Sequence, residues 1–231
     1  MSRNRLLWLT LAVMLAVVVA FQVTATSGER AEFVAQADIP TVAAGVDVLA
    51  GIAEVPVRIR SYDYRRDAFG DSWTDDNAAP GGHNGCDTRN DILDRDLADK
   101  TYVSIKRCPD AVATGTLHDP YTNSTVAFVR GAQVGAAVQI DHIVPLGAAW
   151  ARGARDWPQS ERERFANDPV NLLATSAAAN ESKSDQGPAE WLPRAAFRCA
   201  YAVKWITVST RYKLVVTQPD ESSLTTLLSR C

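Results

Sequence analysis

The chain has 231 residues, of which 46% are apolar, and a formal net charge of −3. This length and apolar content allow one substantial buried core and predict one folded domain after the N-terminal segment. The slightly acidic balance excludes binding to nucleic acid through a high overall positive charge, so any such binding must use a local basic surface.

The N-terminus has the pattern of an export signal. Arg3 and Arg5 precede the apolar run LLWLTLAVMLAVVVAF, and small residues follow up to Ala25. A basic start, an apolar middle and a small-residue cleavage site are typical of a secretory signal peptide. We predict a signal peptide over residues 1–25, with an uncleaved membrane anchor as the alternative, and a linker over residues 26–40. In either case the folded part is exported.

Helices and strands are both predicted along the rest of the chain. Apolar spacing, β-branched runs and turn residues indicate where they lie. They are, in chain order, a short helix from residue 41, a strand at 55–59, loops over 70–90, a helix over 88–100, strands at 101–106 and 124–130, a strand from 138, a short strand at 172–174 and a helix from 176. Asp87, Thr88 or Asn90 is expected to cap the helix over 88–100. This mixture predicts an α+β domain over residues 41–231.

The four cysteines predict two disulfides. No C-x-x-C pair is present, and exported proteins keep disulfides oxidised. Cys199 opens a segment with helical apolar spacing, and a second predicted helix, from about residue 221 to residue 230, ends at Cys231. Two antiparallel helices with a short connection favour the pair Cys199–Cys231 and leave Cys86–Cys108. Free buried thiols are the alternative.

The strand from residue 138 carries two ionisable neighbours, Asp141 and His142, in the stretch VQIDHIVPLGAAW. Successive side chains on a strand point to opposite faces. Two neighbours that share one reaction from opposite sides would explain this arrangement. An unperturbed histidine, with a pKa of about 6.5, is mostly neutral at neutral pH and is suited to act as a general base.

Two downstream asparagines complete a pattern. Asn171 precedes the short strand and Asn180 lies on the helix that follows it, so strand, strand and helix form a ββα unit. The segments DHIVPL and NLLATSAAANESKSD resemble the HNH, or ββα-metal, nuclease family. They are similar to the HNH domain of the RNA-guided CRISPR effector nuclease, and more similar to the C-terminal HNH domain of GmrSD-type restriction enzymes. With YDYRRDAFGDSW, NGCDTRNDIL and DPYTN, the resemblance extends from Tyr62 to Cys231.

The resemblance implies a fold and a set of roles. The fold is a ββα-metal core over residues 138–185, embedded in additional helices and strands. Asp141 and Asn180 are expected to hold one metal ion, His142 to activate water, and Asn171 to orient the histidine or its loop. An acid at the first position favours a hard cation such as Mg²⁺ or Mn²⁺ over zinc.

Each of these residues also has a structural interpretation. A strand histidine is more often a core or surface residue, and Asn171 is also suited to a turn or cap. Arg89 is a candidate phosphate contact, with an ion pair to Asp87 or Asp91 as the alternative. Lys183 is a candidate contact for the nucleic-acid backbone, with a solvated helix face as the alternative. We expect the tryptophans, Trp73 among them, to act as core or loop anchors.

Two N-glycosylation sequons begin at Asn123 and Asn180. A glycan on Asn180 would destroy the expected metal site, so we expect a secretion route without this modification, as in a bacterium.

The expected function is a secreted, metal-dependent endonuclease that hydrolyses DNA with little sequence specificity. We expect a monomer without a small-molecule cofactor. One alternative is a catalytically inactive HNH-fold module for binding or structure. Another is a metal-independent hydrolase that uses His142 with a serine, although the chain contains no G-x-S-x-G motif.

Overall fold

The computed structural model describes residues 48–59, 61–131 and 135–231. The chain divides into two units, Met1–Thr41 and Val42–Cys231, and all described residues belong to the second. The expected signal peptide, the linker and the first part of the helix from residue 41 lie outside the described residues. Residues 48–51, where this helix was expected to continue, form a turn. Within the described ranges, no helix is both long and apolar enough to cross a membrane.

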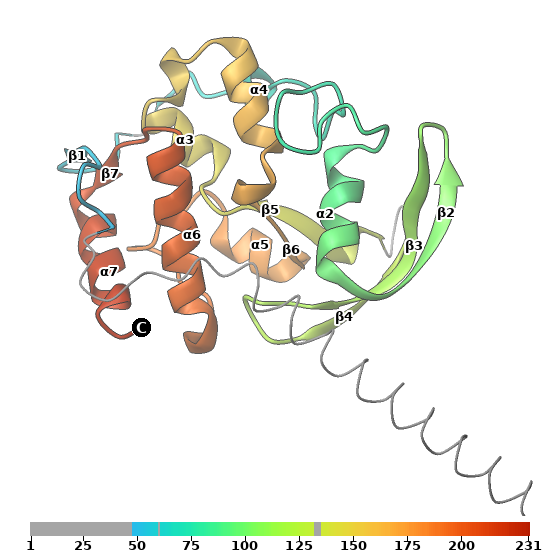
Figure 1. Cartoon of the computed structure of the whole chain (residues 1–231). Coiled ribbons are helices and arrows are strands. Elements are labelled where there is room, and N and C mark those ends of the chain that lie inside the picture. The colour runs from blue at the N-terminus through green and yellow to red at the C-terminus, as the bar shows by residue number, and fades with distance from the viewer. Residues whose placement is uncertain (1–47, 60, 132–134) are drawn as a thin grey trace, which may run out of the picture. The chain divides into compact units, whose positions relative to one another are not determined.

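Helices and strands are mixed along the chain, which confirms the α+β class (Figure 1). The strands are β1 (Glu54–Val55), β2 (Leu97–Ile105), β3 (Cys108–His118), β4 (Thr125–Val129), β5 (Val138–His142), β6 (Leu172–Ser176) and β7 (Val216–Thr217). The α-helices are α2 (Thr88–Asp96), α3 (Leu146–Ala151), α4 (Gln159–Asn167), α5 (Ala177–Lys183), α6 (Arg198–Arg211) and α7 (Gln218–Leu228). The short 3-10 helices are η1 (Arg66–Phe69), η2 (Gly135–Ala137), η3 (Ala154–Asp156), η4 (Pro169–Asn171) and η5 (Ala195–Phe197).

Three small sheets connect these elements. The strands β2, β3 and β4 form an antiparallel sheet in that order, and β5 pairs antiparallel with β6. The short strands β1 and β7 pair in parallel. The predicted strand over residues 55–59 is wrong beyond residue 55. Pro56 has no N–H for a ladder, and Val57 and Ile59 are exposed.

The helix α2 begins where the sequence predicts and ends earlier. The side chain of Asp87 accepts a hydrogen bond from the backbone N–H of Asn90, so Asp87 is the N-cap. The predicted continuation to residue 100 is wrong, because the chain turns into β2 at Leu97. Leu97 pairs with Leu117 of β3, and both side chains are buried in one core. The burial of Leu97 in this core outweighs the helical spacing of the apolar residues, so the chain forms a strand from this position.

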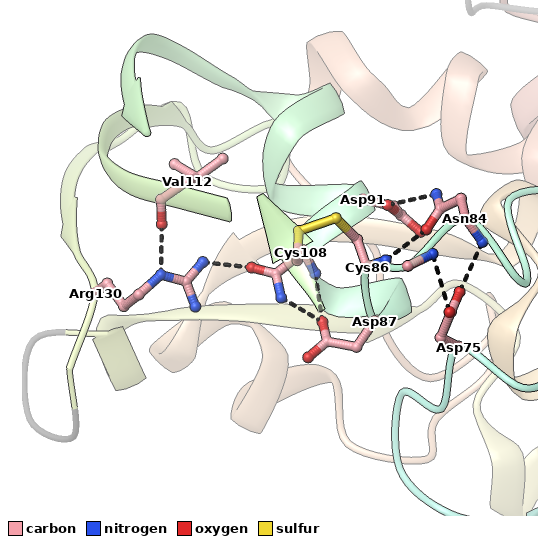
Figure 2. Close-up of a disulfide and its surroundings, with 10 residues drawn as sticks. Asp75, Asn84, Cys86, Asp87, Asp91, Cys108, Val112 and Arg130 are labelled. Carbon is pink, nitrogen blue, oxygen red and sulfur yellow. Dashed lines mark hydrogen bonds between the residues drawn. A yellow bond between two sulfur atoms is a disulfide. The ribbon is translucent and has the colours of Figure 1, made fainter. Parts of the chain in front are cut away.

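A disulfide ties the loop before α2 to the start of β3. Cys86 is bonded to Cys108, as predicted (Figure 2). In the same loop, the two carboxylate oxygens of Asp75 accept hydrogen bonds from the backbone N–H groups of Asn84 and Gly85. The loop before α2 is therefore fixed by one covalent bond and by satisfied backbone donors.

The pair β5–β6 separates two apolar cores. Val138 and Ile140 contribute to a core with α2, β3 and β4, whereas Leu173 contributes to a larger core with α6 and α7. The helix α5 follows β6 directly, and the side chain of Ser176 caps it. This arrangement is the predicted ββα unit. The helices α6 and α7 lie side by side and are joined by the predicted disulfide Cys199–Cys231 (Figure 1).

The buried carboxylate of Asp119 holds the DPYTN turn against the β6–α5 junction. It is 1% exposed and accepts hydrogen bonds from the Thr175 hydroxyl, from the backbone and hydroxyl of Ser176, from the Thr122 hydroxyl and from the Tyr121 backbone. Burial acts to raise the pKa of Asp119, but these hydrogen bonds prevail and lower it. The carboxylate is thus a bonded anion at the centre of the junction.

Replacing Asp119 by alanine should destabilise the fold, because five donors would lose their acceptor. We expect Asp119→Ala to lower the free energy of unfolding in urea by about 2–4 kcal/mol. The matched control is Asp110→Ala, at an exposed position of β3, which should change it by less than about 0.5 kcal/mol. Equal stability of the two variants would contradict the role assigned to Asp119.

Candidate active site

Asp141 and His142 end strand β5 and face opposite sides of the β5–β6 pair. Asp141 lies across from Leu173 and His142 across from Leu172. The Asp141 carboxylate contacts the DPYTN turn and α5, whereas the His142 ring contacts the loop that contains Trp73. Both residues nevertheless line one cleft of about 290 Å³, because the strand ends there. The opposed directions expected from the sequence are thus present in the structure.

The imidazole of His142 is held from two sides. Its Nε2 lies 2.9 Å from the backbone carbonyl oxygen of Ala166, and its ring stacks on Trp73 with a centroid distance of 5.4 Å and an angle of 11°. The side chain is 7% exposed. Burial lowers the pKa of His142 to about 3, so the ring is neutral at neutral pH. Trp73 has a φ of 59°, a left-handed conformation that is unusual for a bulky residue and places strain next to the site.

The carboxylate of Asp141 is buried and has two protein partners. Lys183 Nζ lies 2.9 Å from Oδ1, and the Tyr121 hydroxyl donates to Oδ2 at 2.6 Å. Lys183 also donates to the backbone carbonyl of His142 at 2.7 Å. Burial raises the pKa of Asp141 and lowers that of Lys183, and the ion pair between them opposes both shifts. Burial and the nearby Asp141 raise the pKa of Tyr121, which keeps its hydroxyl protonated as a donor.

Lys183 therefore does not lie on a solvated helix face. Its side chain is completely buried, and its ammonium group bonds two groups of strand β5. Lys183 therefore fixes the positions of Asp141 and of the His142 backbone. Because no part of its side chain is exposed, it does not contact the nucleic-acid backbone in this arrangement.

Asn171 is fully buried directly behind the strand end. Its Oδ1 accepts from the backbone N–H of Val144 at 2.8 Å, its Nδ2 donates to the Val144 carbonyl, and its backbone carbonyl accepts from Ile143. These bonds fix the turn that follows His142. Asn171 contacts the loop of the histidine and is not among the residues that line the cleft.

Asn180 reaches the cleft from helix α5. It lines the same hollow as Asp141 and His142, and its Nδ2 donates to Gln139 Oε1 at 2.7 Å. Glu181, Ser184 and Asp185 line the cleft as well. The structure thus brings Asp141, His142 and Asn180 together at one cleft, the three residues that the resemblance singles out.

Arg89 lies apart from this cleft. Its guanidinium donates to the backbone carbonyls of Gly135 and Val138, at 3.0 and 2.9 Å, and so ties α2 to the start of β5. Burial lowers its pKa. The structure gives Arg89 a backbone partner instead of the ion pair to Asp87 or Asp91 that was considered from the sequence.

The oxygen donors in the cleft fit a hard divalent cation. The described residues contain no group of three or more His, Cys, Asp and Glu side chains that could form a complete metal cage. Asp141 and Asn180 offer one carboxylate and one amide, and a carboxylate oxygen that accepts one hydrogen bond keeps acceptor capacity. Mg²⁺ usually keeps several waters and uses one or two carboxylates together with substrate phosphates. The donor set therefore suits Mg²⁺ or Mn²⁺ better than zinc.

Two residues that contact the site were not predicted from the sequence. Tyr121 bonds Asp141 and Trp73 stacks on His142, although both lie in loops far from strand β5 in the sequence. Their segments, DPYTN and GDSW, belong to the wider pattern of the resemblance. That pattern could have singled them out, but spacing along the chain does not reveal which residues they contact.

Comparisons with known proteins place the chain in a family. The family described as GmrSD restriction endonucleases, C-terminal domain, matches residues 87–227. A protein of Arthroderma benhamiae named "Uncharacterized secreted protein" is 38% identical over 150 residues, which cover 63% of this chain and 68% of the relative. No solved structure gives a significant match. The matched region contains the whole ββα unit, and the chain belongs to the family of the C-terminal domain of GmrSD restriction endonucleases.

Proposed function

We propose that the protein is a secreted, metal-dependent endonuclease that hydrolyses phosphodiester bonds of DNA with little sequence specificity. The observation that carries this proposal is the convergence of Asp141, His142 and Asn180 on one cleft, with the first two on opposite faces of β5. Membership of a family of restriction endonuclease domains supports a nuclease.

His142 is the general base in this proposal. Its Nε2 faces a carbonyl oxygen, which only accepts hydrogen bonds, so Nε2 carries the hydrogen and Nδ1 is the nitrogen that can take a proton. A pKa of about 3 gives a neutral but weak base. A phosphate anion in the cleft raises this pKa, because a nearby negative charge favours the protonated ring. The stacked Trp73 holds the ring and favours the cation that forms.

Asp141 and Asn180 are the proposed metal ligands. A bound divalent ion neutralises charge on the phosphate and on the departing oxygen. Lys183 and Tyr121 fix the Asp141 carboxylate in position, and Asn171 fixes the turn after His142. The protein thereby holds the ligand and the base on opposite sides of the substrate position.

Secretion is supported by two independent observations. Two disulfides cross-link the described domain, and disulfides persist in oxidising compartments. The relative from Arthroderma benhamiae is named a secreted protein. We further propose that the protein acts as a monomer without a small-molecule cofactor.

A plasmid assay tests the function. We expect supercoiled DNA to be nicked in Mg²⁺ or Mn²⁺, nicking to stop in EDTA, and His142→Ala to lower the rate by at least about 100-fold, the usual contribution of a general base. His118→Ala, at an exposed position, is the control. Nicking that survives EDTA indicates a metal-independent hydrolase. A wild-type protein that does not nick in any of these conditions indicates an inactive HNH-fold module.

Metal binding tests the ligands without relying on activity. We expect Mn²⁺ titration, followed by electron paramagnetic resonance, to show about tenfold weaker binding by Asn180→Ala, because one oxygen donor is lost. Ser182→Ala, on the same helix and outside the cleft, should bind as the wild type does. Equal affinities for the two variants would remove Asn180 from the metal site.

The low pKa of His142 predicts a pH dependence of stability. Its pKa is about 3 when folded and about 6.5 when unfolded, so the unfolded chain takes up the proton first as the pH falls. Stability is therefore lost from about pH 6.5 downwards, by about 1.4 kcal/mol per pH unit. Urea unfolding between pH 7.5 and 5 should show this loss in the wild type and in His118→Asn. In His142→Asn the loss should be smaller, and an unchanged loss would contradict the buried neutral ring.

A further inference from the structure

The cleft needs a phosphate contact that the two predicted residues do not supply. Arg89 donates to backbone carbonyls away from the cleft, and Lys183 is buried against Asp141 and the carbonyl of His142. Neither cation has a free donor directed to solvent at the cleft. A side-chain cation that contacts the phosphate beside the proposed metal ion has to come from another residue.

Arg66 occupies the position that this contact requires. It lines the 290 Å³ cleft and also a smaller hollow of about 20 Å³ bounded by Trp73 and His142. Arg66 is therefore on the wall next to the base. Its side chain is exposed, and its guanidinium has no ion pair with any residue in the described part of the chain. Burial is the main cause of the low pKa of His142, and the charge of Arg66 lowers it further, which agrees with their proximity.

The charges around the cleft leave Arg66 available to a phosphate. Three acids line the cleft, of which Asp141 is paired with Lys183 and Asp185 with Arg58, whose Nη2 lies 2.5 Å from its carboxylate. Glu181 is the remaining acid, at an exposed position on α5. Among the described residues that line the cleft, Arg66 is the one cation. Arg66 therefore shares the cleft wall with Asp141 and His142 and has the positive charge that a phosphate there requires.

The turn that carries Arg66 is firmly attached to the domain. Arg66 begins η1, whose last residue, Phe69, is 2% exposed in the large core. Arg162 of helix α4 donates to the Ala68 carbonyl at 2.7 Å. A guanidinium on a fixed turn can grip a phosphate with two parallel hydrogen bonds at a lower entropic cost than one on a mobile loop.

We propose that Arg66 binds the scissile phosphate in the cleft and orients it toward His142. This inference rests on the proposed nuclease function and names the residue that recognises the substrate. The phosphate is the shared feature of any nucleic acid, so Arg66 contributes affinity without sequence preference.

The test uses the full chain and a fluorescein-labelled DNA duplex. Anisotropy titrations in Mg²⁺ are carried out in a His142→Ala background, which prevents cleavage by the base. We expect Arg66→Ala to weaken binding about tenfold, the typical effect of losing a charged hydrogen bond. The slope of log affinity against log salt should fall by about 1. Arg66→Lys should restore part of the affinity, because it returns the charge without the planar fork.

The adjacent arginine provides a matched control. Arg65 is also exposed, is paired with Asp67 at 3.6 Å and does not line the cleft, so Arg65→Ala should bind nearly as the parent does. Equal binding by Arg66→Ala and Arg65→Ala would overturn the assignment of Arg66 while leaving the nuclease function intact. Failure of the wild-type protein to nick a plasmid counts against the function itself. No measurable DNA binding by any variant would overturn both.

Discussion

The buried carboxylate of Asp141 sets the condition that the surrounding structure has to meet. An ionised group that is 3% exposed loses its water and is stable only where charges and donors replace it. Lys183 supplies the opposite charge and Tyr121 supplies a hydroxyl donor. Each partner arrives on a different element, so α5 and the DPYTN turn both have to dock on strand β5.

The docking of these elements follows from a second buried carboxylate. Asp119 binds the residues that end β6 and begin α5, and it also holds the turn that carries Tyr121. One acid thus positions the partners of the other. This dependence explains why polar residues recur in a region that otherwise consists of core, and it links Asp119 to the candidate site as well as to the fold.

The ββα unit could be predicted from the sequence because its signals are local. β-branched runs mark β5 and β6, Ser176 caps α5, and strand alternation fixes the opposed directions of Asp141 and His142. β3 was not predicted, because its Pro109, Gly115 and mixed burial give no period. Likewise, the inward direction of Lys183 depends on Asp141, which is 42 residues away. Tertiary contacts decide whether a charged side chain faces water or a partner. The pattern of neighbouring residues in the sequence does not indicate this direction.

The two walls of the cleft come from different parts of the chain. The family match covers residues 87–227, which contain Asp141, His142 and Asn180. Trp73, which shields the ring of His142, and Arg66, beside the same ring, precede this region and are carried by η1 and the loop after it. The matched region therefore accounts for the proposed base and metal ligands. The segment before it supplies Trp73, which stacks on the proposed base, and Arg66, which lines the hollow beside it. The site is therefore complete only when this segment packs against the ββα unit.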